Sequence, residues 1–166
     1  MPMQTITLEN TTIVFDREKS INYKTEYNSP CSCQDCRNYN ENIKTNPELI
    51  SFLSNFGVDY NRPEEVFSYD IDEDADSPIN STAYYGVFGE IQGDEVHIQK
   101  FGVSISFEKG SFVPNDREDE CFWIVVEGDF PYVLDEERET SISMPSPSLL
   151  QRVKARIKNF LEMSSK

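Results

Sequence analysis

Residues 101–107 alternate large apolar side chains with glycine or serine. The apolar positions are Phe101, Val103, Ile105 and Phe107. Successive side chains of a β-strand point to opposite faces, so this period of two predicts a strand with one buried face, as is typical of antiparallel sheets. Residues 83–91 are rich in aromatic and β-branched side chains, and residues 122–126 are continuously apolar, as expected of a central strand. We therefore expect residues 82–137 to form an antiparallel sheet.

Shorter β-prone segments surround this region. Residues 5–8 and 11–15 lie on either side of Glu9 and Asn10 and predict an opening hairpin, followed by a polar lead that ends at residue 30. Residues 96–99 also suit a strand. We expect residues 132–134 to extend the region of the last strand beyond Pro131, which marks an edge, a bulge or a turn.

Two helices are expected before the sheet. From Cys33 a stripe recurs at helical spacing through Cys36 to Ile43, which would place both cysteines against the core. The second helix starts with Asn46 as N-cap and ends at Gly57 as the C-terminal cap. Its start also has proline at the first helical position and glutamate in the first turn, and its apolar face is formed by Leu49, Phe52, Leu53 and Phe56. Residues 62–67 are expected to form one further helical turn.

A C-terminal amphipathic helix is expected within residues 146–163, with Ser146 or Ser148 as its cap. Its apolar face comprises Leu149, Leu150, Val153, Ile157, Phe160 and Leu161, and its outer face carries Arg152, Lys154, Arg156 and Lys158. These basic side chains should be attracted to the acidic remainder of the chain. The order of elements predicts an α+β fold in one globular domain, residues 1–166, divided into a lead (1–30), a helical part (31–67), a sheet (82–137) and the C-terminal helix (146–163).

The formal net charge of −15 limits the possible partners. An acidic surface repels phosphate backbones and anionic membranes, so we expect neither nucleic acid nor a membrane as partner. It attracts basic proteins and speeds their association. The sequence contains no apolar run of about 18 residues and no secretory signal. We therefore expect a cytoplasmic protein with reduced thiols.

Cysteines form the clearest candidate site. Cys31, Cys33 and Cys36 lie within six residues, and Cys121 lies beside the single tryptophan. A C-x-x-C spacing is typical of a zinc half-site, and all four cysteines together would complete a tetrahedral zinc site. Two alternatives are a redox-active pair at a helix start, as in thioredoxin-like proteins, and simple burial of the thiols in the core.

Acidic residues form the candidate partner surface, in segments 70–76 and 116–139. Its members include Asp70, Asp72, Asp74, Asp76, Glu118, Asp119 and Glu120. The first segment spaces its carboxylates as a calcium loop does, but Ala75 and Ser81 stand where that loop needs glycine and glutamate, so we interpret the segment as a solvated loop. Catalysis has little support, because His97 is the single histidine and no nucleophile elbow, P-loop or dinucleotide motif is present.

Three longer segments follow one another in a characteristic order. They are CSCQDCRNYNENI, PELISFLSNFGVDYNRPEEVF and FWIVVEGDFPYVLDEE. In this order they resemble a family of small, uncharacterised bacterial proteins, over about residues 31–137. The resemblance implies a single domain but no catalytic residue, because no activity is assigned to that family. The chain departs from the family pattern at Tyr132, where a tryptophan is expected.

These patterns predict an acidic protein that acts by binding, with a basic protein as its partner and no cofactor. An inhibitor or immunity protein that masks a basic nuclease toxin is one concrete form of this hypothesis. The alternative is a structural domain stabilised by zinc at Cys31, Cys33, Cys36 and Cys121. An enzyme of unknown class is the third interpretation.

Overall fold

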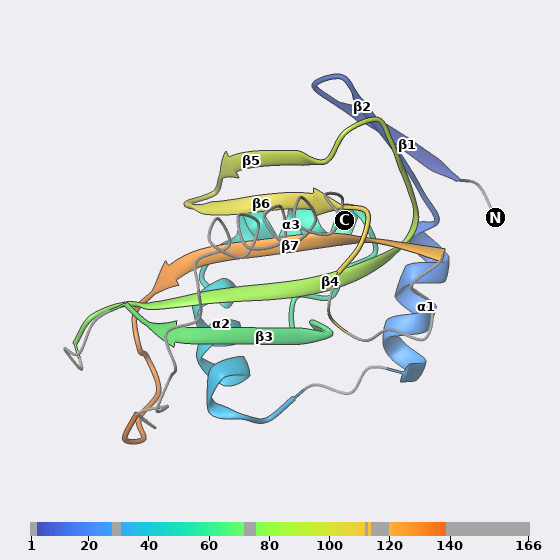
Figure 1. The fold of residues 1–166 in the computed structure, drawn as a ribbon. Coiled ribbons are helices and arrows are strands. Elements are labelled where there is room, and N and C mark those ends of the chain that lie inside the picture. The colour runs from blue at the N-terminus through green and yellow to red at the C-terminus, as the bar shows by residue number, and fades with distance from the viewer. Residues whose placement is uncertain (1–2, 28–30, 72–75, 112, 114–119, 139–166) are drawn as a thin grey trace, which may run out of the picture.

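The computed structural model describes residues 3–27, 31–71, 76–111, 113 and 120–138. Within these ranges the chain forms an antiparallel sheet and three helices, so the predicted α+β class is confirmed (Figure 1). The elements are β1 (Gln4–Leu8), β2 (Thr11–Phe15), α1 (Arg17–Tyr27), α2 (Gln34–Lys44), α3 (Pro47–Asn55), β3 (Glu65–Asp70), β4 (Ile79–Gln92), β5 (Val96–Lys100), β6 (Val103–Glu108) and β7 (Cys121–Phe130). None of the described helices is long and apolar enough to span a membrane.

The sheet is organised around the long strand β4. Its strand order is β1-β2-β4-β7-β6-β5, and β3 also pairs with β4. The first part of β4 pairs with β3, its last four residues pair with β2, and β7 lies along its other side from Ile79 to Phe88. The predicted hairpin and central strand are therefore present as β1–β2 and β7, and the alternating segment is present as β6 from Val103 on. Phe101, expected to begin that strand, instead lies in the turn between β5 and β6, with a φ of +57°.

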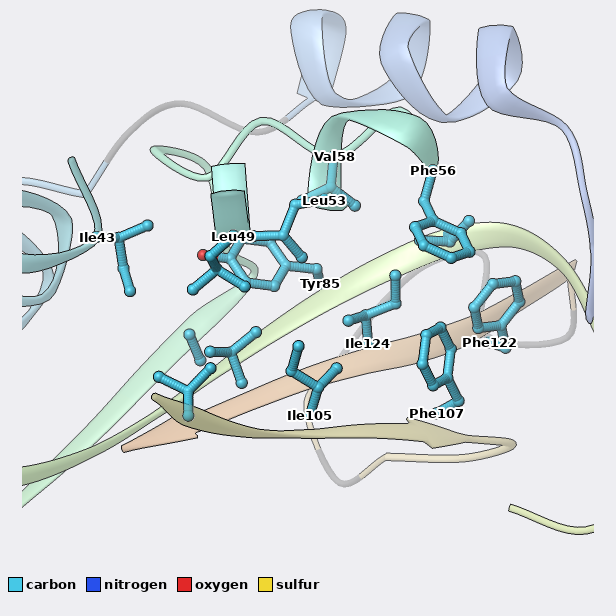
Figure 2. Close-up of a cluster of buried hydrophobic side chains, with 14 of the residues drawn as sticks. Ile43, Leu49, Leu53, Phe56, Val58, Tyr85, Ile105, Phe107, Phe122 and Ile124 are labelled. Atoms are coloured by element: carbon cyan, nitrogen blue, oxygen red, sulfur yellow. The ribbon is translucent and has the colours of Figure 1, made fainter. Parts of the chain in front are cut away.

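The main core lies between one face of the sheet and helices α2 and α3 (Figure 2). We call this side of the sheet the helix face. Its buried side chains include Tyr39, Ile43, Leu49, Leu53 and Phe56 from the helices and their cap, and Phe15, Tyr85, Ile105, Phe107, Phe122 and Ile124 from the strands. The alternate residues of the same strands point to the opposite side, which we call the Trp123 face.

Two buried tyrosines connect α2 to the sheet. Tyr85 Oη lies 3.1 Å from Tyr39 Oη and 3.0 Å from the carbonyl oxygen of Tyr60. A carbonyl can only accept, so Tyr85 donates to Tyr60 and accepts the hydroxyl hydrogen of Tyr39. Burial raises the pKa of both phenols, which keeps them neutral in the core.

Helix α3 has the caps that its sequence predicts. The Asn46 side chain accepts a hydrogen bond from the backbone N–H of Leu49 (3.2 Å). At the other end Gly57 has a φ of +79°, and the N–H of Val58 donates to the carbonyl of Leu53 (3.2 Å). This is the arrangement in which glycine ends a helix without steric cost.

The prediction of a helical turn at residues 62–67 is wrong. Residues 65–70 instead form β3, which pairs with β4 along its whole length, and the N–H of Glu64 donates to the carbonyl of Tyr84 (2.8 Å). The proline and the acidic pair favour a helix start locally, but pairing with the edge of β4 gives the segment backbone hydrogen bonds at alternate residues and buries Val66.

Helix α1 lies within the stretch that we expected to be a polar lead. Its sequence has no apolar stripe, but the side chain of Asp16 caps its start by accepting from the N–H of Lys19 (2.9 Å). Ser20 then connects it to the sheet: its hydroxyl donates to the Asp16 carbonyl (2.8 Å) and accepts from the N–H of Phe88 (3.1 Å). The missed signal was the aspartate N-cap.

The observed sheet also begins and ends at residues other than those predicted. Strand β4 begins at Ile79, three residues before the region expected to form the sheet. Residues 132–134 do not continue β7. They turn back to α2, where the N–H of Val133 donates to the side-chain oxygen of Asn38 (2.9 Å). The predicted C-terminal helix, residues 146–163, lies outside the described residues.

Candidate metal centre

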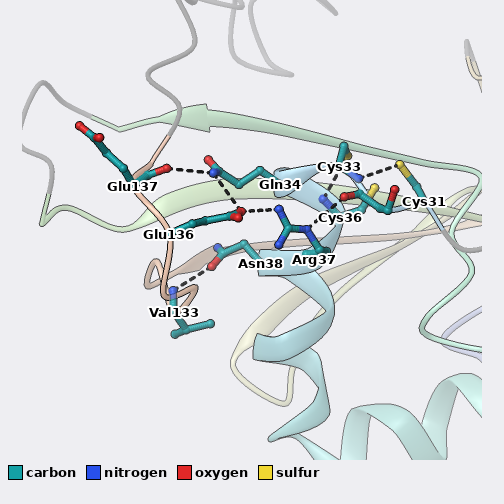
Figure 3. Close-up of polar contacts among 10 residues, drawn as sticks. Cys31, Cys33, Gln34, Cys36, Arg37, Asn38, Val133, Glu136 and Glu137 are labelled. Atoms are coloured by element: carbon teal, nitrogen blue, oxygen red, sulfur yellow. Dashed lines mark hydrogen bonds and ion pairs between the residues drawn. The ribbon is translucent and has the colours of Figure 1, made fainter.

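Three cysteines meet at the start of α2 (Figure 3). Cys33 is the N-cap of the helix and has an extended backbone conformation, and Cys36 lies in its first turn. The Sγ atoms of Cys31, Cys33 and Cys36 all lie within 4.8 Å of one another. Cys31 and Cys33 are exposed and Cys36 is buried, so the group has one side in the core and one side in solvent.

Backbone amides point at two of these sulfurs. The N–H of Cys33 donates to Cys31 Sγ (3.4 Å), and the N–H of Cys36 donates to Cys33 Sγ (3.5 Å). Such donors favour a thiolate over a thiol. In a C-x-x-C turn they accordingly favour the charged form that binds a metal ion.

The three thiols differ in acidity. The hydrogen bond from the N–H of Cys33 lowers the pKa of Cys31. Burial raises the pKa of Cys33 and Cys36, and for Cys36 the hydrogen bonds with the other two cysteines raise it further. Cys31 is therefore the first thiolate to form, and Cys36 keeps its proton unless a cation replaces it.

Cys121 does not join the three cysteines. It is buried at the start of β7, where it pairs with Phe88. The next residue, Phe122, belongs to the core of the helix face. Because side chains alternate along a strand, Cys121 points to the Trp123 face, and the predicted four-cysteine site is not assembled.

The alternative prediction, in which the thiols are simply buried in the core, holds for only part of the cluster. The helical stripe correctly predicts that Cys36 and Ile43 are buried. It does not hold for Cys33, which is exposed because it precedes the first helical turn. A residue at the N-cap still has extended backbone and does not share the direction of the helical stripe.

The segment after β7 holds the start of α2 in place (Figure 3). Arg37 donates through Nε to the carbonyl of Ser32 (3.0 Å) and forms an ion pair with Glu136. Hydrogen bonds from Arg37 and then Gln34 hold the pKa of Glu136 below its ordinary value. Gln34 also donates to the carbonyl of Glu137 (3.1 Å). These contacts fix the turn that carries the cysteines.

Asn38 makes a second connection with the same segment. Its side chain donates to the carbonyl of Pro131 (3.2 Å) and accepts from the N–H of Val133. Sequence reasoning missed Arg37, Asn38 and Glu136 as supports of the site. Their partners lie more than 90 residues away, so no local spacing could indicate them.

The described acidic residues of the predicted partner surface lie in different parts of the molecule. Asp70, at the end of β3, forms an ion pair with Arg138, and Glu120, just before β7, forms one with Lys19. Asp70 pairs with Ile79, whereas Glu120 adjoins the residue opposite Phe88. Nine residues of strand correspond to about 30 Å, so these two carboxylates lie at opposite ends of the sheet. Asp76 is exposed, and Asp72, Asp74, Glu118 and Asp119 lie outside the described residues.

His97 lies on β5, with Nδ1 2.8 Å from Ser106 Oγ. Its register with Ser106 and Val125 places it on the Trp123 face, away from the cysteine cluster. A Cys–His pair between His97 and these three cysteines is therefore not formed.

Comparisons with protein-family models, curated proteins and solved structures find no match to this chain. The resemblance to a family of uncharacterised bacterial proteins stays a prediction.

Proposed function

We propose that this protein binds a thiophilic metal ion, of which Zn²⁺ is the best fit, through the thiolates of Cys31, Cys33 and Cys36. The observation that supports the proposal is the proximity of the three Sγ atoms, all within 4.8 Å of one another. In a tetrahedral zinc site with bonds of ~2.3 Å, sulfur atoms lie roughly 3.8 Å apart, so only a small contraction is needed. Soft thiolate ligands select zinc or copper(I) over magnesium and calcium.

The position of Cys121 changes the kind of site that we propose. Structural zinc sites have four protein ligands, whereas a site with three protein ligands keeps a position for water or another small ligand. Cys31 and Cys33 are exposed, which leaves that fourth position on the solvent side. We therefore favour an ion with an exchangeable ligand over the closed structural site that the sequence predicted.

Proton release accompanies binding in this proposal. The raised pKa of Cys33 and Cys36 means that both thiols carry protons near neutral pH. The ion must displace these protons, so the affinity for the metal should increase as the pH rises. The amide donors to Cys31 and Cys33 then stabilise the bound thiolates.

Titration with Co²⁺ tests this function directly. We expect the reduced protein, purified without chelator, to bind one Co²⁺ with the intense thiolate-to-metal absorption of a sulfur-ligated tetrahedral ion, and elemental analysis to find one zinc per chain. Cys33→Ser and Cys36→Ser should each weaken binding by more than the ~10–100-fold typical of losing an outer-shell partner.

Two features of the chain supply controls. Serine is a favoured N-cap, so Cys33→Ser should keep α2 folded while it loses the metal. Cys121→Ala removes a cysteine on the other face and should leave the Co²⁺ spectrum unchanged. Substoichiometric zinc together with equal Co²⁺ binding by the Cys33→Ser and Cys121→Ala variants would contradict the proposal.

A further inference from the structure

The Trp123 face carries a second apolar cluster. Trp123 is fully buried, and Tyr84, Val113 and Val125 are less than 5% exposed. Helices α2 and α3 pack on the opposite side of the sheet, and the described part of α1 contacts this side near Phe88, through Lys19, Ser20 and the ring of Tyr23. The burial of Trp123 is therefore not explained by the described helices.

The indole of Trp123 provides a second observation about this cluster. Its Nε1–H is buried and has no acceptor among the described residues. A buried tryptophan N–H normally finds a hydrogen-bond partner, because leaving it unsatisfied is costly. An acceptor for this N–H must therefore come from outside the described residues.

Carboxylates border this cluster. Glu108 pairs across the strands with Trp123, and Glu127 follows Val125 on the same face of β7. Burial, and then the nearby charges of Glu95 and Glu127, raise the pKa of Glu108 to about 7. An apolar patch with an acidic border suits an amphipathic segment that has basic residues beside its apolar stripe.

The C-terminal part of the chain has this pattern. Residues 148–166 contain five basic residues and one acidic residue. At about 100° per residue, an α-helix over residues 149–161 would place Lys154 and Arg156 at the two borders of the apolar stripe. Arg152 and Lys158 would lie on the opposite side.

The length of the chain allows the contact. Arg138 Nη1 donates to the carbonyl of Ser77 (3.3 Å), which places the last described residue at the end of the sheet where β4 begins. The nine residues 139–147 can span up to ~30 Å. A helix of residues 149–161 is about 20 Å long, which is shorter than the face formed by β4 and β7.

We propose that residues 149–161 dock as an amphipathic helix on the Trp123 face, with the apolar stripe over Trp123 and Val125 and with a basic border of the helix toward Glu127. The occupant of this face is a segment of the same chain, which distinguishes it from an external partner. The contact is independent of the proposed metal site, which lies on the other side of the sheet.

Trp123 is the single tryptophan, so its fluorescence reports on this face alone. We expect the full chain to give a blue emission maximum and weak quenching by acrylamide. Leu150→Asp with Ile157→Asp should raise the quenching constant about threefold or more and shift the emission to the red, because the indole becomes exposed. Arg152→Asp with Lys158→Asp introduces the same two carboxylates on the opposite side of the helix and should leave quenching unchanged.

A chain that ends at Arg138 separates docking from folding. Its quenching should be as strong as that of the Leu150→Asp, Ile157→Asp variant, and an added peptide of residues 146–166 should restore protection in a saturable manner, whereas the same peptide with both aspartates should not. Equal quenching in the full chain and the Leu150→Asp, Ile157→Asp variant overturns the proposal. So does protection of the full chain that depends on protein concentration, because a second copy would then be the occupant.

Discussion

At the scale of single residues, the geometry of the cysteine cluster follows from a change of backbone conformation. Cys33 has a φ of −65° and a ψ of 162°, and the residues after it are helical. The turn brings the sulfurs of Cys31 and Cys36 close to that of Cys33 and presents amide donors to two of the three sulfurs. Of these three cysteines, which lie within six residues of sequence, Cys31 and Cys33 are thus exposed and only Cys36 is part of the core.

Glu108 gives the clearest dependence of stability on pH. Burial and the carboxylates of Glu95 and Glu127 raise its pKa from 4.5 to about 7 in the folded protein. The folded state then holds its proton more tightly than the unfolded state. Its contribution to the free energy of unfolding therefore falls as the pH rises from 4.5 through 7.

We expect Glu108→Gln to remove this loss. Glu108 is partly exposed and solvent screens its charge, so the variant should exceed the parent by about 1–2 kcal/mol in free energy of unfolding at pH 8 and by close to zero near pH 4.5. Urea unfolding at both pH values measures the difference. Glu95→Gln removes one neighbouring charge and should give an intermediate effect; a difference that does not vary with pH would contradict the assignment.

At the scale of elements, contacts with neighbouring elements determine the secondary structure of segments whose local sequence signals are weak. Helix α3 carries proline, two caps and an apolar face in its own sequence, and it forms where predicted. The sequences of β3 and α1 lack this combination of caps and apolar face. The edge of β4 selects β3, and Ser20 with Arg17 fastens α1 to the sheet and to α3.

The end of α3 provides a graded test of backbone strain. A Cβ on Gly57 would lie 2.5 Å from the carbonyl oxygen of Arg17, and the residue has a φ of +79°. We expect Gly57→Ala to lower the free energy of unfolding by about 2–4 kcal/mol, from left-handed backbone and steric overlap together. Urea unfolding is the measurement.

Two other glycines serve as controls for this test. Gly102 has a φ of +76° but open space around it, so Gly102→Ala should cost only the backbone strain, about 1 kcal/mol. Gly110 has neither feature, and Gly110→Ala should be close to neutral. Equal effects at Gly57 and Gly102 would show that α1 gives way instead of resisting the added methyl group.

At the scale of the whole molecule, the net charge of −15 remains the main argument for a basic protein partner. The described members of the predicted surface do not form one contiguous patch, since Asp70 and Glu120 lie at opposite ends of the sheet. The hypothesis that the protein masks a basic partner therefore stays a prediction from charge, as do the cytoplasmic location and the exclusion of nucleic acid.

Salt dependence tests the partner hypothesis. If charge drives association, a partner recovered by the immobilised protein at low ionic strength should bind progressively more weakly between about 0.05 M and 0.5 M salt, because the Debye length falls. Quantification of the captured protein at each salt concentration measures this. Affinity that is flat across the range, or the absence of any captured partner, counts against charge as the basis of recognition.

The sequence by itself determined the elements whose signals are local. The alternation at 101–107, the apolar run at 122–126 and the Asn46–Pro47 start of α3 depend on side-chain direction and capping, which act within one element. The cysteine turn is also local, because Cys33 caps the helix that holds Cys36, but the helical stripe wrongly placed Cys33 against the core.

Tertiary structure alone decided what depends on pairing between distant segments. It made residues 65–70 a strand, fixed α1 through Ser20, and fastened the turn of α2 to Glu136. It also separated Cys121 from the other three cysteines, because the strand register that buries Phe122 on one face must point its neighbour to the other. Spacing in a sequence cannot give that register, which is set by the packing of the whole sheet.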